Sequence, residues 1–366
     1  MDVSRKTTAY PLKAPTVDHP KTPAIDPPKT KAVSPKAPTV DHPKTKAVSP
    51  KAAAVSHLGV ELPRHRLLST TELSAMGFST RWISNAVAIG ELVRVRRGVY
   101  LYGEDWRSLG RDQRALCKIH AFHLGTEGMT VYSHFSAARL HGCFTWNVPE
   151  TIHITQKFST KRNAYADDVM VHTRPVARRD LTYVDGRWIT SLERTVVDCA
   201  RVLEFRKAVI IADHVLRLGG DVHLMWQIAL DSAGSRGIRN VRRVLANASG
   251  SSESPGETLT RLLIDLLDIP PAELQYEIST RLGLFRADFA WPACKLILEF
   301  DGRDKYFNYQ PTEKTLFEER RREKVLMEAG WSFIRIEWAD LFSPADLQRR
   351  LLTAMNGSCI TAGLAS

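Results

Sequence analysis

The chain has 366 residues and a mass of 41.1 kDa; its 51 Lys and Arg residues outnumber its 40 Asp and Glu residues, which gives a net charge of +11 and a pI of about 9.5. This length exceeds that of one ordinary domain, so we expect two or more folded units. No apolar stretch approaches the ~20 residues of a membrane-spanning helix, and no apolar run follows the basic N-terminus as in a signal peptide. The sequence therefore predicts a cytoplasmic protein without a membrane partner. Five cysteines without a CxxC pair argue against a zinc module or a disulfide scaffold.

The excess positive charge is unevenly distributed along the chain. Residues 1–56 carry +6, residues 57–252 carry +9, and residues 253–342 carry −5. Basic surface attracts polyanions, whereas clustered carboxylates repel them unless a cation intervenes. The composition therefore indicates that the protein binds nucleic acid. It also indicates separate roles for the middle and C-terminal parts.

The first segment, 1–56, contains ten of the nineteen prolines and has Tyr10 as its only aromatic residue. Lys-Ala-Pro-Thr-Val-Asp-His-Pro-Lys-Thr occurs at 13–22 and again at 36–45. A segment rich in Pro, Lys and Thr has too few apolar residues to form a hydrophobic core, so we expect a disordered arm. Contact with phosphate groups and a role as a solvated linker both remain open for it.

The next segment, 62–105, is predicted to begin with two short helices. Ser69-Thr70-Thr71-Glu72 has the spacing of a capping box, which predicts a helix over 70–76 that stops at Gly77. Ser79-Thr80 caps a second helix over 80–89. Apolar and polar residues then alternate over 92–102 around Arg97-Gly98, which predicts a β-hairpin.

Two helices followed by a basic hairpin are the layout of a winged helix-turn-helix domain, whose second helix enters the major groove of DNA. We expect Arg81 and Asn85 on the second helix to contact bases, and Arg94, Arg96 and Arg97 on the hairpin to contact the DNA backbone. A small helical domain with solvated arginines is the alternative interpretation.

This stretch resembles the N-terminal winged helix of the AbiEi-type antitoxin family. The residues that carry the resemblance are Leu68-Ser-Thr-Thr-Glu-Leu73, Gly77 and Arg97-Gly-Val-Tyr100. A weaker resemblance extends to Tyr132-Ser-His-Phe-Ser-Ala-Ala-Arg-Leu-His-Gly142 and to Thr190-Ser-Leu-Glu-Arg-Thr-Val-Val-Asp-Cys-Ala200. It implies binding of double-stranded DNA, a cognate toxin, and a place in type IV toxin–antitoxin or phage-defence modules.

The middle segment, 106–250, predicts an antitoxin-like α/β domain. Helical periodicity is expected over 113–124, 134–141, 192–203, 205–217 and 238–247, with strands over 151–155, 169–173 and 187–189. Four histidines, His134, His141, His153 and His172, are spaced by 7, 12 and 19 residues. These gaps fit no metal-ligand pattern, so we predict no metal site here.

The C-terminal segment, 253–345, predicts a helix over 257–268 and strands over 274–279, 284–290 and 295–301, followed by a tail over 346–366. If residues 292–295 form a turn, opposed positions of the last two strands sum to 587, which places Asp288 across from Glu299, with Asp301 on the same face. The opposite face is apolar and expected in the core: Phe285, Ala287, Phe289, Trp291, Leu296, Leu298 and Phe300. Three such carboxylates suit Mg²⁺ or Mn²⁺, and a solvated strand face is the alternative.

The same segment resembles the very-short-patch-repair-like branch of the PD-(D/E)XK nuclease superfamily. The motifs are Arg286-Ala-Asp-Phe-Ala-Trp-Pro292, Glu299-Phe-Asp-Gly-Arg-Asp-Lys-Tyr306 and Gly330-Trp-Ser-Phe-Ile-Arg335. The resemblance implies a restriction-endonuclease-like α/β fold in which Asp288 and Glu299 hold the metal and Glu257 completes the acidic cluster. The superfamily's lysine, two residues after the glutamate, is Asp301 here; Lys305 would take its place.

Together these features predict an α+β multidomain protein with a leading and a rival function. The leading hypothesis is a DNA-binding protein with a Mg²⁺-dependent endonuclease-like domain that hydrolyses phosphodiester bonds. The rival is a non-enzymatic antitoxin and transcriptional repressor whose nuclease fold is inactive. Both share the prediction of DNA binding, so only chemistry separates them.

Overall fold

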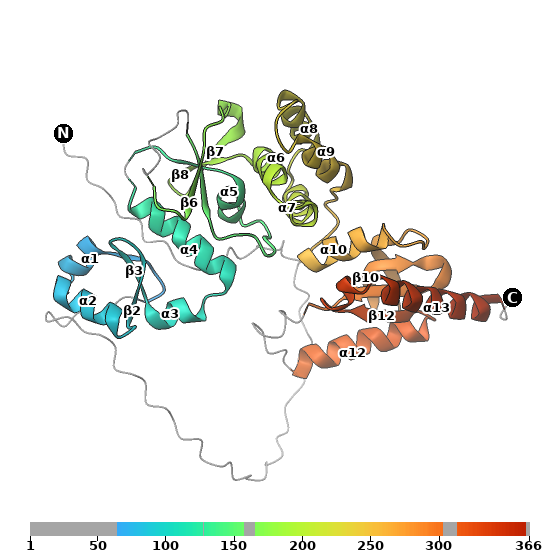
Figure 1. Ribbon diagram of the computed structural model, residues 1–366. Helices are drawn as coiled ribbons and strands as arrows, with labels where there is room; N and C mark the ends of the chain where they lie inside the picture. Colours follow the sequence, from blue (N-terminus) through green and yellow to red (C-terminus); the bar gives the residue numbers. More distant parts are fainter. Residues whose placement is uncertain (1–63, 127, 157–164, 303–312, 364–366) are drawn as a thin grey trace, which may run out of the picture. The chain divides into compact units, whose positions relative to one another are not determined.

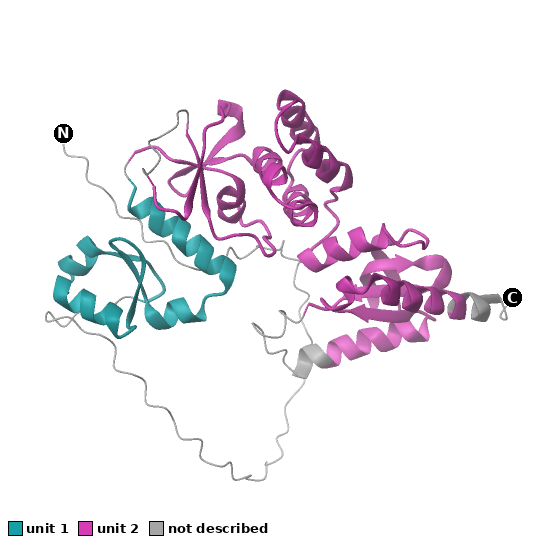
Figure 2. Cartoon of the chain, viewed as in Figure 1, with its two compact units in different colours: residues 1–126 teal, residues 127–366 magenta. Residues whose placement is uncertain are grey.

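The computed structural model describes residues 64–126, 128–156, 165–302 and 313–363 (Figure 1). The predicted arm at 1–56 and Lys305 lie outside these residues. The chain divides into two compact units, Met1–Thr126 and Glu127–Ser366 (Figure 2). In the part of the chain that is described, no helix is both long and apolar enough to cross a membrane.

The first unit begins with the two predicted helices. Ser69 and Glu72 form the expected capping box, since Glu72 N donates to Ser69 Oγ at 3.1 Å and Ser69 N donates to Glu72 Oε2 at 2.8 Å. Ser79 Oγ accepts from Trp82 N at 3.1 Å and so caps the second helix. The elements run β1 (Leu68–Ser69), α1 (Thr70–Ala75), α2 (Thr80–Ala88), β2 (Leu92–Arg96), β3 (Val99–Tyr102), α3 (Gly103–Ser108) and α4 (Arg111–Leu124).

The predicted hairpin is confirmed as β2 and β3, which join β1 in a three-stranded sheet of order β1-β3-β2. Arg97 and Gly98 form its turn, where Gly98 adopts the left-handed φ of 74° that favours glycine. An irregularity between Arg94 and Arg96 interrupts the expected alternation. One face of the sheet packs on α1 and α2, and the other packs on Cys117 and Ala121 of α4. Because α4 completes this core, the unit extends beyond residue 105, where the sequence placed its end.

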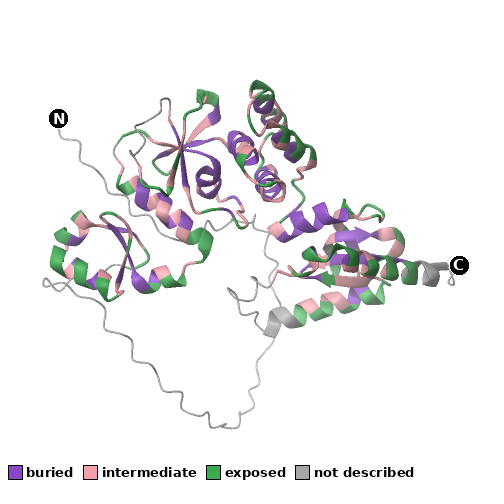
Figure 3. Ribbon diagram, in the orientation of Figure 1, coloured by how far each residue is buried: buried purple, intermediate pink, exposed green. Residues whose placement is uncertain are grey.

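The second unit begins with a five-stranded sheet of order β6-β5-β4-β8-β7. The predicted strands are present, and β4 and β7 were not foreseen. The strands are β4 (Val131–Tyr132), β5 (Ile152–Thr155), β6 (Val169–His172), β7 (Leu181–Val184) and β8 (Arg187–Thr190). A helical core follows the sheet in sequence and contains α6 and α7, whose inner faces are buried (Figure 3). The helices are α5 (His134–Leu140), α6 (Leu192–Val202), α7 (Phe205–Arg217), α8 (Val222–Asp231) and α9 (Ile238–Asn247).

The C-terminal part of the second unit holds a four-stranded sheet of order β12-β11-β10-β9, in which β12 lies parallel to β11. The expected register is confirmed, because Phe289 pairs with Leu298 and Trp291 pairs with Leu296. The elements are α10 (Pro255–Ile264), β9 (Glu273–Thr280), β10 (Gly283–Trp291), β11 (Leu296–Phe300), α12 (Glu313–Glu328), β12 (Ser332–Ile336) and α13 (Pro344–Gly363).

The prediction of one polar and one apolar face for the β10–β11 hairpin is wrong in part. Phe285 and Ala287 do not share the cluster of Phe289; they pack with Ala290 and Ile297 in a second cluster that includes Leu326 of α12. The β9–β10 ladder omits Asp288 and its opposite residue Gln275, which has φ 51°. Side-chain direction therefore changes at Asp288, and the sheet is buried on both faces.

The segment 346–366 was expected to be a tail. Most of it belongs to α13, where Leu347, Leu351 and Met355 recur every four residues and are buried in the same cluster as Phe289. This helix therefore contributes to the C-terminal core.

Candidate functional site

The second helix and the hairpin of the first unit present exposed basic residues. Arg81 and Asn85 are exposed on α2, and Arg94 and Arg97 are exposed on the hairpin. Arg96 is half-buried, with its guanidinium 5.1 Å from the ring centroid of Phe122 on α4. The structure therefore places four of the five predicted DNA-binding side chains on the surface and packs the fifth against the core.

These arginines differ from their neighbours in ion pairing. Arg64 pairs with Glu104 at 3.1 Å, and Arg66 pairs with Glu72 at 3.0 Å. Among the described residues, no salt bridge involves Arg81, Arg94 or Arg97. Their positive charge is therefore unpaired among the described residues of this unit and available to an anionic partner.

The C-terminal unit brings Asp288 and Glu299 close to one another, as the register predicted. The backbone N–H of Phe300 donates to Asp288 Oδ2 at 3.2 Å. Glu299 Oε1 accepts from Arg322 at 3.1 Å, and its Oε2 lies 3.7 Å from Arg335. Burial raises the pKa of Glu299 and the charge of Asp288 adds to this rise, while Arg322 and Arg335 oppose it. Glu299 is thus a partly buried carboxylate held between two guanidinium groups.

Of the remaining predicted site residues, Lys305 lies outside the described chain, and Glu257 and Asp301 are held by hydrogen bonds of their own. Glu257 is buried in α10, and its Oε2 accepts from Glu253 N at 2.8 Å and from Gln275 at 3.1 Å. Asp301 follows β11, and its N–H donates to the carbonyl of Ile336. Among the described Asp, Glu, His and Cys side chains, these carboxylates do not provide three ligand atoms within 4.8 Å of one another. The arrangement offers a hard cation two oxygen donors, so the metal role of Asp288, Glu299 and Asp301 stays a prediction.

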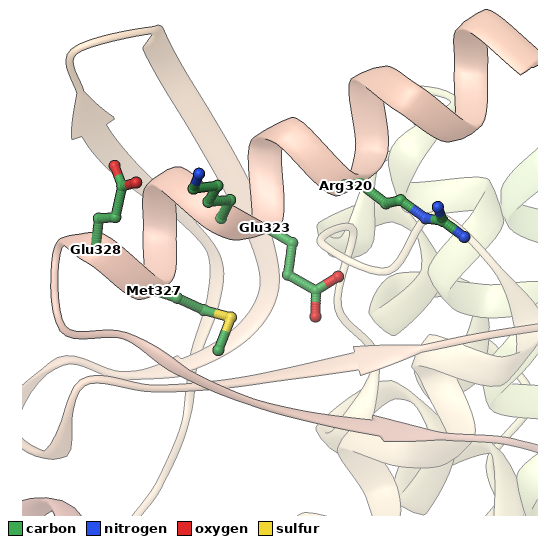
Figure 4. Close-up of a pocket in the computed structure, with 5 residues that line it drawn as sticks. Arg320, Glu323, Met327 and Glu328 are labelled. Atoms are coloured by element: carbon green, nitrogen blue, oxygen red, sulfur yellow. The ribbon is translucent and has the colours of Figure 1, made fainter.

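The outer face of α12 carries both signs of charge. A shallow hollow of about 460 Å³ on this helix is lined by Arg320, Glu323, Lys324, Met327 and Glu328. Figure 4 shows the labelled side chains projecting from the helix. Glu323 and Glu328 also pair with Arg335 and Arg281. Acidic and basic groups alternate here, so this face offers less net attraction to DNA than the first unit does.

Three of the four histidines that the spacing argument set aside come together in the second unit: His134, His153 and His172. His153 Nδ1 lies 2.9 Å from His172 Nε2, and the rings of His134 and His172 stack with centroids 3.7 Å apart. Parallel pairing of β5 with β6 places Thr155 opposite His172 and so brings His172 beside His153, which is 19 residues away in sequence. Spacing could not reveal the group, because strand pairing creates it.

Comparison with known proteins gives matches of two kinds, to a family and to individual proteins. Residues 61–103 match the AbiEi antitoxin family of transcriptional regulators. Two uncharacterized proteins, from two strains of Mycobacterium tuberculosis, are each 31% identical to the chain over 249 residues, which is 68% of this chain and 86% of each relative. The chain belongs to the family of these mycobacterial proteins and carries an AbiEi antitoxin domain. That AbiEi domain spans β1 to β3 and so includes Arg81, Asn85 and the hairpin arginines. The resemblance to antitoxins is confirmed for this domain, and the resemblance of the C-terminal part to nucleases stays a prediction.

Proposed function

We propose that this protein is a DNA-binding transcriptional regulator of the AbiEi antitoxin type, which represses its own promoter and acts with a cognate toxin. The observation that carries the proposal is the set of exposed, uncompensated arginines within the matched residues 61–103. Duplex DNA is the polyanion that such a surface attracts, and displacement of its counterions supplies most of the binding energy.

In this proposal the first unit acts as a winged helix. Helix α2 enters the major groove, where Arg81 donates to acceptors on a guanine edge and Asn85 bonds to adenine. Arg94 and Arg97 on the hairpin bind phosphate groups and fix the orientation of α2. Arg96 contributes less than predicted, because its side chain is half-buried over Phe122.

The test is binding of the full chain to a fluorescent duplex from upstream of its own gene, measured by anisotropy against a scrambled duplex over a range of salt concentrations. Arg81→Ala is expected to weaken specific binding about ten- to hundredfold and to bring it close to binding of the scrambled duplex. Arg97→Ala is expected to weaken binding to both duplexes alike and to lower the salt slope by about one.

The matched control is Arg64→Ala, which also removes one positive charge from this unit but from an arginine paired with Glu104. It is expected to bind almost as the unaltered chain does. If Arg81→Ala keeps its selectivity, or Arg64→Ala is as damaging as Arg97→Ala, α2 and the hairpin are not the DNA-contacting surface.

A Mg²⁺-dependent endonuclease is the second candidate, supported by the arrangement of the C-terminal elements. Helix α10, the antiparallel strands β9 to β11, helix α12 and the parallel strand β12 follow one another in the order expected of a restriction-endonuclease-like domain. Asp288 and Glu299 are adjacent on β10 and β11 and are the residues that would hold the ion. When bound, Mg²⁺ would supply electrophilic activation of a phosphate.

This second candidate is tested by incubating supercoiled plasmid with Mg²⁺ or Mn²⁺ and the unaltered chain, Asp288→Ala or Glu299→Ala. Loss of cleavage in both variants, with DNA binding retained, would support the enzyme. Equal nicking by all three proteins, or none, would leave the regulator as the better account. Arg64→Ala serves here as a folded variant with an intact acidic pair.

A further inference from the structure

The cluster of His134, His153 and His172 combines three potential ligands from three separate elements. His134 begins α5, His153 lies in β5, and His172 ends β6. One ring nitrogen of each lies within 4.8 Å of the others, and the closest pair is 2.9 Å apart. Tetrahedral Zn²⁺ with Zn–N bonds of about 2.0–2.1 Å holds its ligand nitrogens about 3.3 Å apart, so small side-chain rotations bring the three rings to that spacing.

A hydrogen bond to a residue outside the cluster orients the ring of His134, as in many metal sites. Ser133 Oγ lies 3.0 Å from His134 Nδ1, and Thr155 Oγ1 donates to Ser133 Oγ at 2.8 Å. A partner on Nδ1 leaves Nε2 of His134 as its ligand atom and fixes the ring orientation. The backbone of His134 has φ 49°, a left-handed conformation that is unfavourable for a residue with a side chain and that persists here at the centre of the cluster.

The surroundings of the cluster also favour metal binding. His134 and His153 are buried and His172 is half-buried, and burial disfavours a charged imidazole. Neutral imidazole is the form that binds a metal.

The cluster opens on a basic cavity of about 390 Å³. The cavity is lined by His134, His172, Arg174, Arg201, Val202 and Arg236. Arg201 is fixed in place, since its Nε and NH2 donate to the carbonyl of Arg236 at 3.2 and 3.1 Å. Asp198 interacts with Arg174 and Arg201 and offsets part of their charge. The three arginines would still repel a dication, and an anion in contact with the metal and the arginines would offset this repulsion.

We propose that His134, His153 and His172 bind a divalent transition metal ion of the Zn²⁺ type, with its open coordination position turned toward the arginine-lined cavity, where a phosphate-like anion completes the coordination. Nitrogen ligands select such a metal over Mg²⁺, which prefers oxygen. The site is separate from both the AbiEi domain and the acidic pair at Asp288 and Glu299. It does not depend on the proposed function in DNA binding.

The test titrates the full-length, tag-free chain with Co²⁺ after chelator treatment, because tetrahedral Co²⁺ absorbs strongly in the visible region and octahedral Co²⁺ bound by oxygen does not. One Co²⁺ per chain, displaced by one Zn²⁺, is expected. His172→Gln and His153→Gln should abolish the tetrahedral bands, and Ser133→Ala should weaken binding about ten- to hundredfold. Inorganic phosphate should shift the spectrum of the unaltered chain, and this shift should be lost in Arg174→Ala.

Two histidines provide controls. His141, at the end of the same helix, binds the carbonyl of Thr190 through Nε2, and His223 is exposed on α8. His141→Gln and His223→Gln should leave the Co²⁺ bands unchanged. Retention of circular dichroism in His172→Gln, which alters a half-buried edge-strand residue, shows that loss of metal is not loss of fold. Absence of tetrahedral bands from the unaltered chain, or their persistence in His172→Gln and His153→Gln, would overturn the proposal.

Discussion

Replacement of Asp213 tests which contacts hold the C-terminal part of the second unit to the helical core formed by α6 to α9 of the same unit. Asp213 lies in α7 and is 1% exposed. Its carboxylate accepts from Ser249 N at 2.8 Å, from Thr258 Oγ1 at 2.9 Å and from Arg261 NH2 at 2.8 Å. Thr258 and Arg261 belong to α10, so one buried carboxylate bonds two helices and the segment between them.

The size of the effect follows from burial of the partner charge. The Arg261 side chain is 9% exposed, and its Nε has no hydrogen-bond partner among the described residues. Asp213→Asn removes the negative charge at nearly constant volume and leaves the guanidinium with only the exposed Asp265, 3.8 Å from Arg261 NH1, as a counter-charge, which costs about 3–5 kcal/mol. That is a large fraction of the roughly 5–15 kcal/mol that stabilises a typical domain.

Urea unfolding followed by circular dichroism measures this loss as a shift of the midpoint. The variant Asp213→Asn with Arg261→Met removes both charges and should recover part of the stability, because no isolated charge stays buried. Glu328→Gln breaks the exposed pair with Arg281 and should shift the midpoint far less. Two results would contradict this explanation. One is an Asp213→Asn variant no less stable than Glu328→Gln, and the other is a double variant that loses more stability than the two single substitutions together.

Two further substitutions test the core and its pH dependence. A Cβ on Gly256 would lie 1.9 Å from Cε1 of the buried Phe300, so Gly256→Ala should lower the free energy of unfolding by about 1–3 kcal/mol or more in urea. The control is Gly357→Ala in α13, where a Cβ meets no neighbour within 4 Å. This substitution should not destabilise the protein. Burial lowers the pKa of His214 to about 4, and its Nδ1 accepts from Phe144 N at 2.6 Å. Neutral His214 therefore stabilises the fold above its ordinary pKa of 6.5. This contribution, up to about 3 kcal/mol, is lost as pH falls from 6.5 to 4. His214→Asn should flatten the pH dependence of the free energy of unfolding between these values, and an unchanged dependence would contradict the role given to His214.

Local signals in the sequence predicted local structure well. The capping box at Ser69, the cap at Ser79 and the turn at Arg97-Gly98 depend on residues a few positions apart, and all three are present. The register of β10 and β11 could also be predicted, because a turn of known length fixes which residues oppose one another. Helix α8 was missed although Asp221 caps it through bonds from His223 N and Leu224 N.

The features that could not be predicted depend on contacts distant in sequence. The change of side-chain direction at Asp288 arises where Gln275 of β9 adopts a left-handed conformation and where α12 covers the face expected to be polar. Glu299 meets Arg322 and Arg335 only because α12 and β12 fold back beside β11. The histidine cluster likewise requires β5 and β6 to pair.

The distribution of paired charge argues for different roles of the arginines in the first unit and in the C-terminal part of the second unit. In the C-terminal part of the second unit, two described arginines are engaged by carboxylates: Arg322 by Glu299, and Arg335 by Glu299, Glu319 and Glu323. In the first unit, Arg81, Arg94 and Arg97 have no such partners among the described residues. The net charge of the whole chain is therefore a poor guide to attraction to DNA. It overstates the attraction where arginines form ion pairs with carboxylates and understates it where they do not. The arginines without carboxylate partners lie within the AbiEi domain. Substituting one of them should therefore lower the salt dependence of DNA binding, whereas Arg322→Ala should leave it unchanged.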